Sequence, residues 1–159
     1  MKKQNWRDVA EIAGIVSIVA GLILVAWEIR QANNIARAQM VMELATQANE
    51  FNSSRFKNPE VAELAAAMSD PDHSEFTATQ ESMMAGVAWH FANIFASAQS
   101  AHDNGLLGDD DIRMYRASVA WHLENHPGMR PAFLEVYQTT PWFREMYVFE
   151  PLVELAEAE

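Results

Sequence analysis

Residues 12–27 read IAGIVSIVAGLILVAW, a run of 16 positions without a charged side chain, between Glu11 and Glu28. Ser17 is the one polar side chain in this run. A helix on the surface of a soluble protein usually carries a polar stripe along one face, and this segment has none. Apolar residues on both sides extend the run toward the roughly 20 positions that a helix needs to cross a bilayer core. The stretch therefore predicts a membrane-spanning helix.

Two tryptophans stand at the ends of this predicted span. Trp6 and Trp27 are 21 positions apart, which on a helix is roughly 31 Å, close to the thickness of a bilayer core. Tryptophan favours the two membrane interfaces, so this pair fits an anchor. One alternative is a buried helix of a soluble bundle. Another is a cleaved signal peptide, but the run lacks a small-x-small cleavage site followed by a polar mature start.

One face of the predicted span carries small residues. Ala13, Ser17 and Gly21 recur every four positions, a spacing that places them on one side of a helix. A face of this kind lets a second helix approach closely. It predicts a helix partner in the membrane, self-association included, although small residues are common in membrane helices generally.

Charge divides the chain into an anchor, residues 1–30, and an acidic domain, residues 31–159. The domain carries 7 basic and 19 acidic residues, a balance of −12. Such a domain is repelled by phosphate backbones, so we expect no nucleic-acid partner. Three basic residues precede the span and two follow it closely. This difference favours a cytoplasmic N-terminus for a single-pass protein of a bacterial inner membrane.

The pattern after the anchor is helical throughout, and no strand pattern competes with it. We expect the membrane helix to continue as one long helix to about residue 56. Four further segments show start signals: Asn58-Pro59, a Thr77 to Gln80 capping box before a helix over 78–103, a cap at Asp109, and Pro131. Thr140-Pro141 begins a last region that Pro151 interrupts. The predicted fold class is all-α: one N-terminal transmembrane helix followed by a small helical bundle.

Two soft motifs carry a resemblance to a known family. Ile29-Arg30-Gln31 is followed by Asn33, and Gly105-Leu106-Leu107 is followed by Asp109-Asp110. With the apolar N-terminal span, the chain resembles a large family of uncharacterised small bacterial proteins that have an N-terminal membrane helix and an acidic helical domain. The resemblance covers most of the chain and implies membrane attachment. It implies no catalytic residue.

Four large side chains in the domain are candidates for a partner interface. Trp89 and Trp121 lie opposite the core stripes of their helices, and Met114 shares the face of Trp121. Trp142 belongs to an unusually aromatic C-terminal run. Large aromatic side chains on a face opposite the core would be exposed to water unless another protein segment packs against them. Another helix of the same chain could provide it, or a partner protein could, since tryptophan and methionine are enriched at interfaces.

Three histidines form the one candidate metal constellation. His122 and His126 share a helix face at a spacing of four, and His90 lies on the neighbouring helix. The chain lacks the paired Glu-x-x-His motifs of di-iron bundles and the His-Glu-x-x-His of zinc proteases. Core or capping roles therefore explain these histidines more simply than zinc or iron does.

No catalytic motif accompanies these features. The sequence contains no G-x-S-x-G, and it has no cysteine. We therefore expect a non-catalytic accessory or scaffolding subunit, without a cofactor, that binds a membrane protein complex. The alternative is a ligand- or metal-binding sensor, or an undiagnosed enzyme, that uses the histidine cluster. A third reading is a homo-oligomer formed through the anchor.

Overall fold

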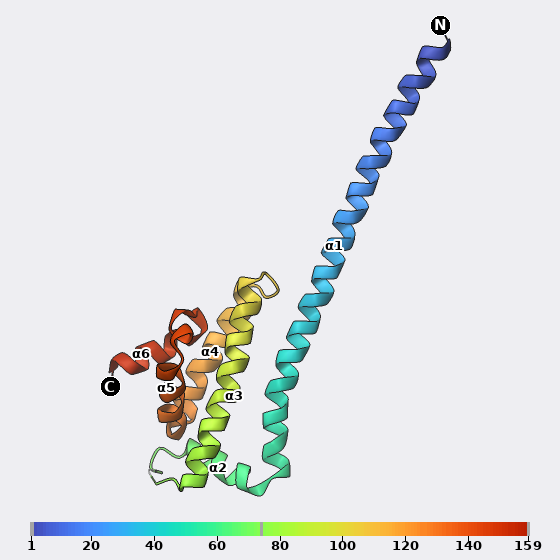
Figure 1. Ribbon diagram of the computed structural model, residues 1–159. Helices are drawn as coiled ribbons and strands as arrows, with labels where there is room; N and C mark the ends of the chain where they lie inside the picture. The colour runs from blue at the N-terminus through green and yellow to red at the C-terminus, as the bar shows by residue number, and fades with distance from the viewer. Residues whose placement is uncertain (1, 74, 159) are drawn as a thin grey trace. The chain divides into compact units, whose positions relative to one another are not determined.

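The structure, a computed structural model, describes residues 2–73 and 75–158, and the side chains at 6–54, 56–73 and 75–157. Every regular element in this part of the chain is a helix, which confirms the all-α prediction (Figure 1). The elements are α1 Lys2–Lys57, α2 Pro59–Ser69, α3 Ala78–Asp103, α4 Asp109–Asn125, η1 Pro127–Met129, α5 Arg130–Thr139, η2 Pro141–Glu145, η3 Tyr147–Phe149 and α6 Glu150–Ala158.

The chain forms two compact units, Met1–Gln39 and Met40–Glu159. The first is the N-terminal part of α1, and the second contains the rest of α1 and all later elements. Because α1 runs from Lys2 to Lys57, the long helix expected to about residue 56 is present. The functional boundary predicted at residue 30 stays a prediction.

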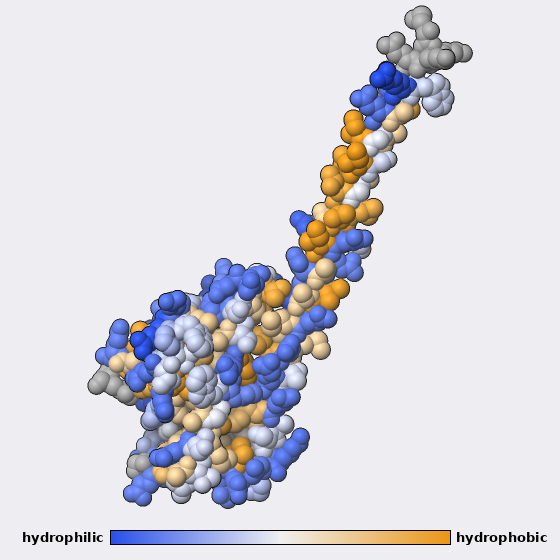
Figure 2. All heavy atoms as spheres, viewed as in Figure 1, coloured by the Kyte–Doolittle hydropathy of each residue, from blue (hydrophilic) through white to orange (hydrophobic). Residues whose placement is uncertain are grey.

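The first unit exposes almost all of its apolar surface. Its large apolar side chains over residues 12–27 are each between 49% and 66% exposed. Figure 2 shows these hydrophobic residues along the N-terminal part of α1. The Ser17 hydroxyl donates to the Ala13 carbonyl at 2.8 Å, so the one polar side chain of the run is satisfied within the helix. By length and composition, this helix is able to cross a membrane.

The second unit is built around α3. Helix α3 buries an apolar stripe that includes Ala88, Phe91, Ile94, Phe95 and Ala98. The helix begins where the capping box predicts: the Thr77 hydroxyl accepts from the Gln80 amide, and the Gln80 side chain accepts from the Thr77 amide. Helix α4 lies beside α3 and runs in the opposite direction (Figure 1).

Two expected helix boundaries are wrong in detail. The N-cap of α4 is Gly108 rather than Asp109, because the Gly108 amide donates to the Asp111 carboxylate at 2.8 Å. Pro151 does not interrupt a helix. It is the second residue of α6, where a missing amide hydrogen leaves no intrahelical bond unmade.

Gln99 connects the C-terminal segment to α3. This buried side chain donates to the Asp103 carboxylate at 2.9 Å, and its oxygen accepts from the Val148 amide at 3.2 Å. A buried amide without a partner costs more than an ordinary hydrogen bond contributes. Gln99 therefore positions η3 against α3 and brings the C-terminal aromatic residues to the bundle.

Gly128 allows η1 to approach α2. A Cβ atom at this position would lie 2.9 Å from Phe76 Cζ and 3.1 Å from Met68 Cα. The second contact is with backbone, which moves less readily than a side-chain tip. The backbone approach at Gly128 therefore requires glycine.

Substitution of Gly128 should be destabilising, and a glycine of α3 provides the matched control. We expect Gly128→Ala to lower the free energy of unfolding by about 1–3 kcal/mol through overpacking. Gly86→Ala should raise it by about 0.5–1 kcal/mol, because a Cβ there meets open space within a helix. Thermal unfolding followed by circular dichroism measures both. Equal effects at the two positions would contradict the close approach at Gly128.

Candidate functional site

An apolar cavity lies within the second unit and is formed by parts of α1, α2, α3, α4 and η1. Its volume is about 390 Å³, which is within the range of small-molecule sites. Among the side chains that the structure describes, no aspartate, glutamate, lysine or arginine lines it, although the domain is strongly acidic. Its lining residues are Ala48, Phe51, Asn52, Ala65, Met68, Phe91, Ile94, Phe95, Met114, Tyr115, Ser118, Trp121, His122, His126 and Met129.

Aromatic rings form one side of this cavity. The ring of His122 lies 4.5 Å from that of Phe91 and 5.1 Å from that of Trp121, measured between centroids. The Trp121 ring also meets the His126 ring edge-on at 5.5 Å. On the α1 side, the Phe51 ring packs edge-on against Phe91 at 5.1 Å. Contacts of this geometry add to area burial and fix the rings in place.

His122 is a lining residue of this cavity with a deeply buried ring nitrogen. Its Nδ1 atom is buried and makes no hydrogen bond with any described residue. Burial lowers the pKa of His122 to about 4, and the nearby His126 contributes to the shift. The imidazole is therefore neutral at physiological pH.

His126 has a structural role at the edge of the cavity. It is the C-cap of α4, and its amide donates to the His122 carbonyl at 3.0 Å. Its Nδ1 lies 2.7 Å from the Ser69 hydroxyl, which connects the end of α4 to the end of α2. This agrees with the capping role that its position before Pro127 predicts.

His90 lies away from the other two histidines. Its Nε2 is 3.2 Å from the Gln47 carbonyl, and its ring lines a second, smaller cavity of about 240 Å³. Among the described residues, no three His, Asp or Glu side chains come together as metal ligands. The metal hypothesis for His90, His122 and His126 stays a prediction to which the geometry adds no support.

The four candidate interface residues fall in two places. Trp121 and Met114 line the cavity and remain 52% and 61% exposed. Trp89 and Trp142 lie beside the buried ring of Phe143, at centroid distances of 6.3 Å and 5.8 Å. We call the second group the Phe143 patch. No described helix buries any of these four side chains. The alternative in which another helix of the same chain covers them is therefore not seen in the described part of the structure.

The predicted anchor residues all lie on α1 in the first unit. Trp6 and Trp27 are 77% and 61% exposed, and Ala13, Ser17 and Gly21 are also exposed. A Cβ atom at Gly21 would meet nothing within 4 Å. The small-residue face is therefore open to a neighbouring helix.

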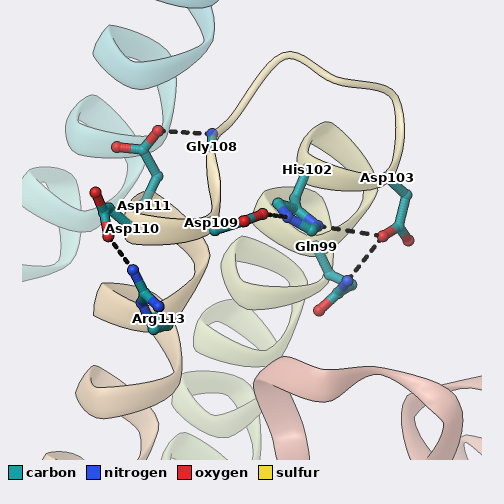
Figure 3. Close-up of polar contacts among 8 residues, drawn as sticks. All are labelled: Gln99, His102, Asp103, Gly108, Asp109, Asp110, Asp111 and Arg113. Atoms are coloured by element: carbon teal, nitrogen blue, oxygen red, sulfur yellow. Dashed lines mark hydrogen bonds and ion pairs between the residues drawn. The ribbon is translucent and has the colours of Figure 1, made fainter.

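A polar cluster at the junction of α3 and α4 is structural (Figure 3). The His102 Nε2 lies 3.0 Å from the Asp109 carboxylate, which raises the pKa of His102 and lowers that of Asp109. Arg113 pairs with Asp110 one turn further along α4. These contacts join the end of one helix to the start of the next.

Sequence reasoning missed the cavity itself. Trp121, Met114 and His122 were singled out for separate reasons, and the structure places all three on one wall. Phe51 and Tyr115 gave no signal of their own, because a helical aromatic residue is most often a core residue. Trp121 lies opposite the core stripe of its helix, and this position was the one sequence feature that singled out this face of α4.

The low pKa of His122 should make the domain less stable in mild acid. The unfolded chain takes up a proton near pH 6.5, and the folded chain only near pH 4. The unfolded state therefore gains protons first as pH falls through this window, and stability is lost by up to about 3 kcal/mol at pH 4. Denaturant unfolding of wild type and His122→Phe from pH 7.5 to 4 measures this. The stability of wild type relative to the variant should fall with pH; a constant difference would contradict the assignment.

Comparison of the chain with protein-family models, with curated protein sequences and with solved structures finds no match. The family resemblance of the N-terminal span and the two soft motifs therefore stays a prediction. The function is argued below from the geometry of the two units.

Proposed function

We propose that this protein is a non-catalytic, single-pass membrane protein that acts as an accessory or scaffolding subunit of a membrane protein complex. The observation that carries the proposal is the exposed apolar surface of residues 12–27. Ten large apolar side chains lie there, and burying one is worth about 1.5–3 kcal/mol. Together they favour a non-aqueous environment by on the order of 10 kcal/mol or more.

An α-helix is a backbone structure that is stable in the interior of a lipid bilayer. In lipid, every backbone amide and carbonyl has to be satisfied within the protein, and an unbroken helix does this along its length. The stretch contains no proline, and its one hydroxyl is bonded to the helix itself. Trp6 and Trp27 then lie near the two interfaces, where indole rings are favoured.

The proposed location is a bacterial inner membrane, with the N-terminus in the cytoplasm and the domain on the other side. The location is supported by the family resemblance, and the orientation by the basic residues before the span. The formal net charge of −12 on the domain disfavours contact with anionic lipid headgroups. We therefore expect the domain to bind protein rather than the lipid surface.

The Phe143 patch is the proposed partner surface of the domain. Trp89 and Trp142 are 41% and 60% exposed while Phe143 beneath them is buried, so the patch has a rigid base. Exposed tryptophans on such a base are typical of interface hot spots. The face formed by Ala13, Ser17 and Gly21 provides a second contact within the membrane, with a partner helix or with a second copy of the chain.

The proposed topology is testable with single cysteines, because the chain has none. We expect Ser100→Cys to react with a membrane-impermeant maleimide in intact spheroplasts, and Gln4→Cys to react only after lysis. The reverse pattern would invert the orientation and leave the anchor in place. Reaction at both positions in intact spheroplasts would contradict a single span.

The proposed interface is tested by co-purification from gently solubilised membranes at native expression. Trp142→Gln and Trp89→Gln should each reduce a stoichiometric membrane partner by about tenfold or more, as expected for hot-spot residues. Phe56→Gln is the matched control, because Phe56 is an exposed aromatic residue outside the patch. A protein that purifies alone, or equal partner recovery in all variants, would contradict the proposed role of the patch.

A further inference from the structure

We propose that Asn104 is a site of spontaneous chemical modification, where the asparagine converts to aspartate or isoaspartate at a rate controlled by opening of the C-terminal end of α3. The inference is independent of the accessory role proposed above. Asn104 is followed by Gly105, and no other asparagine in the chain precedes a glycine. Both residues are exposed, in the loop that arches from Asp103 to Gly108 (Figure 3).

The reaction needs only these two residues and water. The Gly105 backbone nitrogen attacks the Asn104 Cγ atom. A bond forms between these two atoms, the bond from Cγ to Nδ2 breaks, and Nδ2 leaves as ammonia with the amide proton of Gly105. Water then adds to one of the two carbonyl groups of the five-membered succinimide ring, which opens to aspartate or to isoaspartate. Glycine favours the first step, because it has no Cβ atom to hinder its nitrogen and its backbone is the least restricted.

In the folded chain, hydrogen bonds at the end of α3 hold both reacting groups. Asn104 is the C-cap of this helix, and its Nδ2, the leaving nitrogen, donates to the Ser100 carbonyl at 2.7 Å. The Gly105 amide, the attacking nitrogen, donates to the His102 carbonyl at 2.8 Å. Gly105 has a φ of 73°, the left-handed conformation that commonly ends a helix. Ring closure breaks both hydrogen bonds, so this turn has to open first.

The residues that follow anchor the same turn. The Leu106 and Leu107 amides both donate to the Ala101 carbonyl, at 2.8 Å and 3.2 Å, and the Leu107 side chain is buried. Across the loop, the His102 Nε2 lies 3.0 Å from the Asp109 carboxylate. The turn therefore opens only when contacts of the whole junction are lost, and the folded chain should convert slowly.

The product weakens the cap that protects the asparagine. A carboxylate at position 104 has no proton to donate to the Ser100 carbonyl. It also adds negative charge at the C-terminus of α3, where the helix dipole is already negative and where Asp103 and Asp109 lie on either side of His102. Isoaspartate in addition inserts a methylene group into the backbone of the turn. The modified chain should therefore be less stable than the original chain.

The test follows conversion at Asn104 by peptide mapping with mass spectrometry. It uses the full chain in lipid nanodiscs and the same chain with its domain unfolded in guanidinium chloride. Conversion should be about tenfold or more faster in the unfolded chain, as the loss of two neutral hydrogen bonds predicts. Asn125 is the matched internal control, because its Nδ2 donates to the Trp121 carbonyl at 2.9 Å but the next residue is His126. In the unfolded chain it should convert much more slowly than Asn104.

Three variants separate the attacking nitrogen from the added charge. Gly105→Ala is measured in the unfolded chain, where the native φ imposes no strain, and it should slow conversion because the new Cβ atom hinders the nitrogen. Asn104→Asp and Asn104→Ala both remove the donor to the Ser100 carbonyl, but only Asn104→Asp adds charge. At low ionic strength, Asn104→Asp should have an equilibrium constant for unfolding about two- to fivefold larger than that of Asn104→Ala.

Three results would count against the inference. Equal conversion rates at Asn104 in the folded and unfolded chains would show that the hydrogen bonds at the end of α3 do not control the reaction. Conversion at Asn104 that is no faster than at Asn125 in the unfolded chain would show that Asn104 is not a distinct modification site. Equal stability of Asn104→Asp and Asn104→Ala would contradict the proposed effect of the product on the cap.

Discussion

The apolar surface of residues 12–27 is the constraint on which the rest of this protein depends. Ten large apolar side chains on one helix are exposed, and the described part of the first compact unit has no second element that covers them. Water is a poor environment for such a surface. A lipid bilayer removes the free-energy cost of exposing this surface to water, and no further protein segment is needed. The two flanking tryptophans are suited to the two membrane interfaces. The proposed location of the acidic domain, and the kind of partner proposed for it, both depend on this placement.

The second unit combines a well-packed core with a cavity next to it. Helix α3 buries its apolar stripe, and Gln99 and Gly128 fix the segments that pack around it. Interiors of proteins are normally filled to the density of organic crystals. Beside this core lies a cavity whose described lining is largely aromatic and aliphatic. The domain thus has two distinct features, the cavity and the Phe143 patch.

Short-range sequence signals such as helix caps predicted the helices well. The features that these signals did not predict depend on contacts between residues far apart in the chain. Asn58 and Thr77 cap helices where expected, because capping involves residues two or three positions apart. The misplaced cap at Asp109 arises because the Asp111 side chain, one turn in, bonds the Gly108 amide instead. The cavity could not be predicted, since its walls come from positions as far apart as 48 and 129. His90 lines a different cavity from His122 and His126, and spacing within one helix likewise does not predict this.

The most direct test of the central claim is extraction of the native-level, full-length protein from bacterial membranes with alkaline carbonate. This treatment strips proteins held by surface contacts and leaves those with a helix inside the bilayer. The account predicts that the protein remains at full length in the membrane pellet with an integral membrane marker. Recovery of the protein in the supernatant would contradict the membrane span, and residues 12–27 would then have to be covered by another protein.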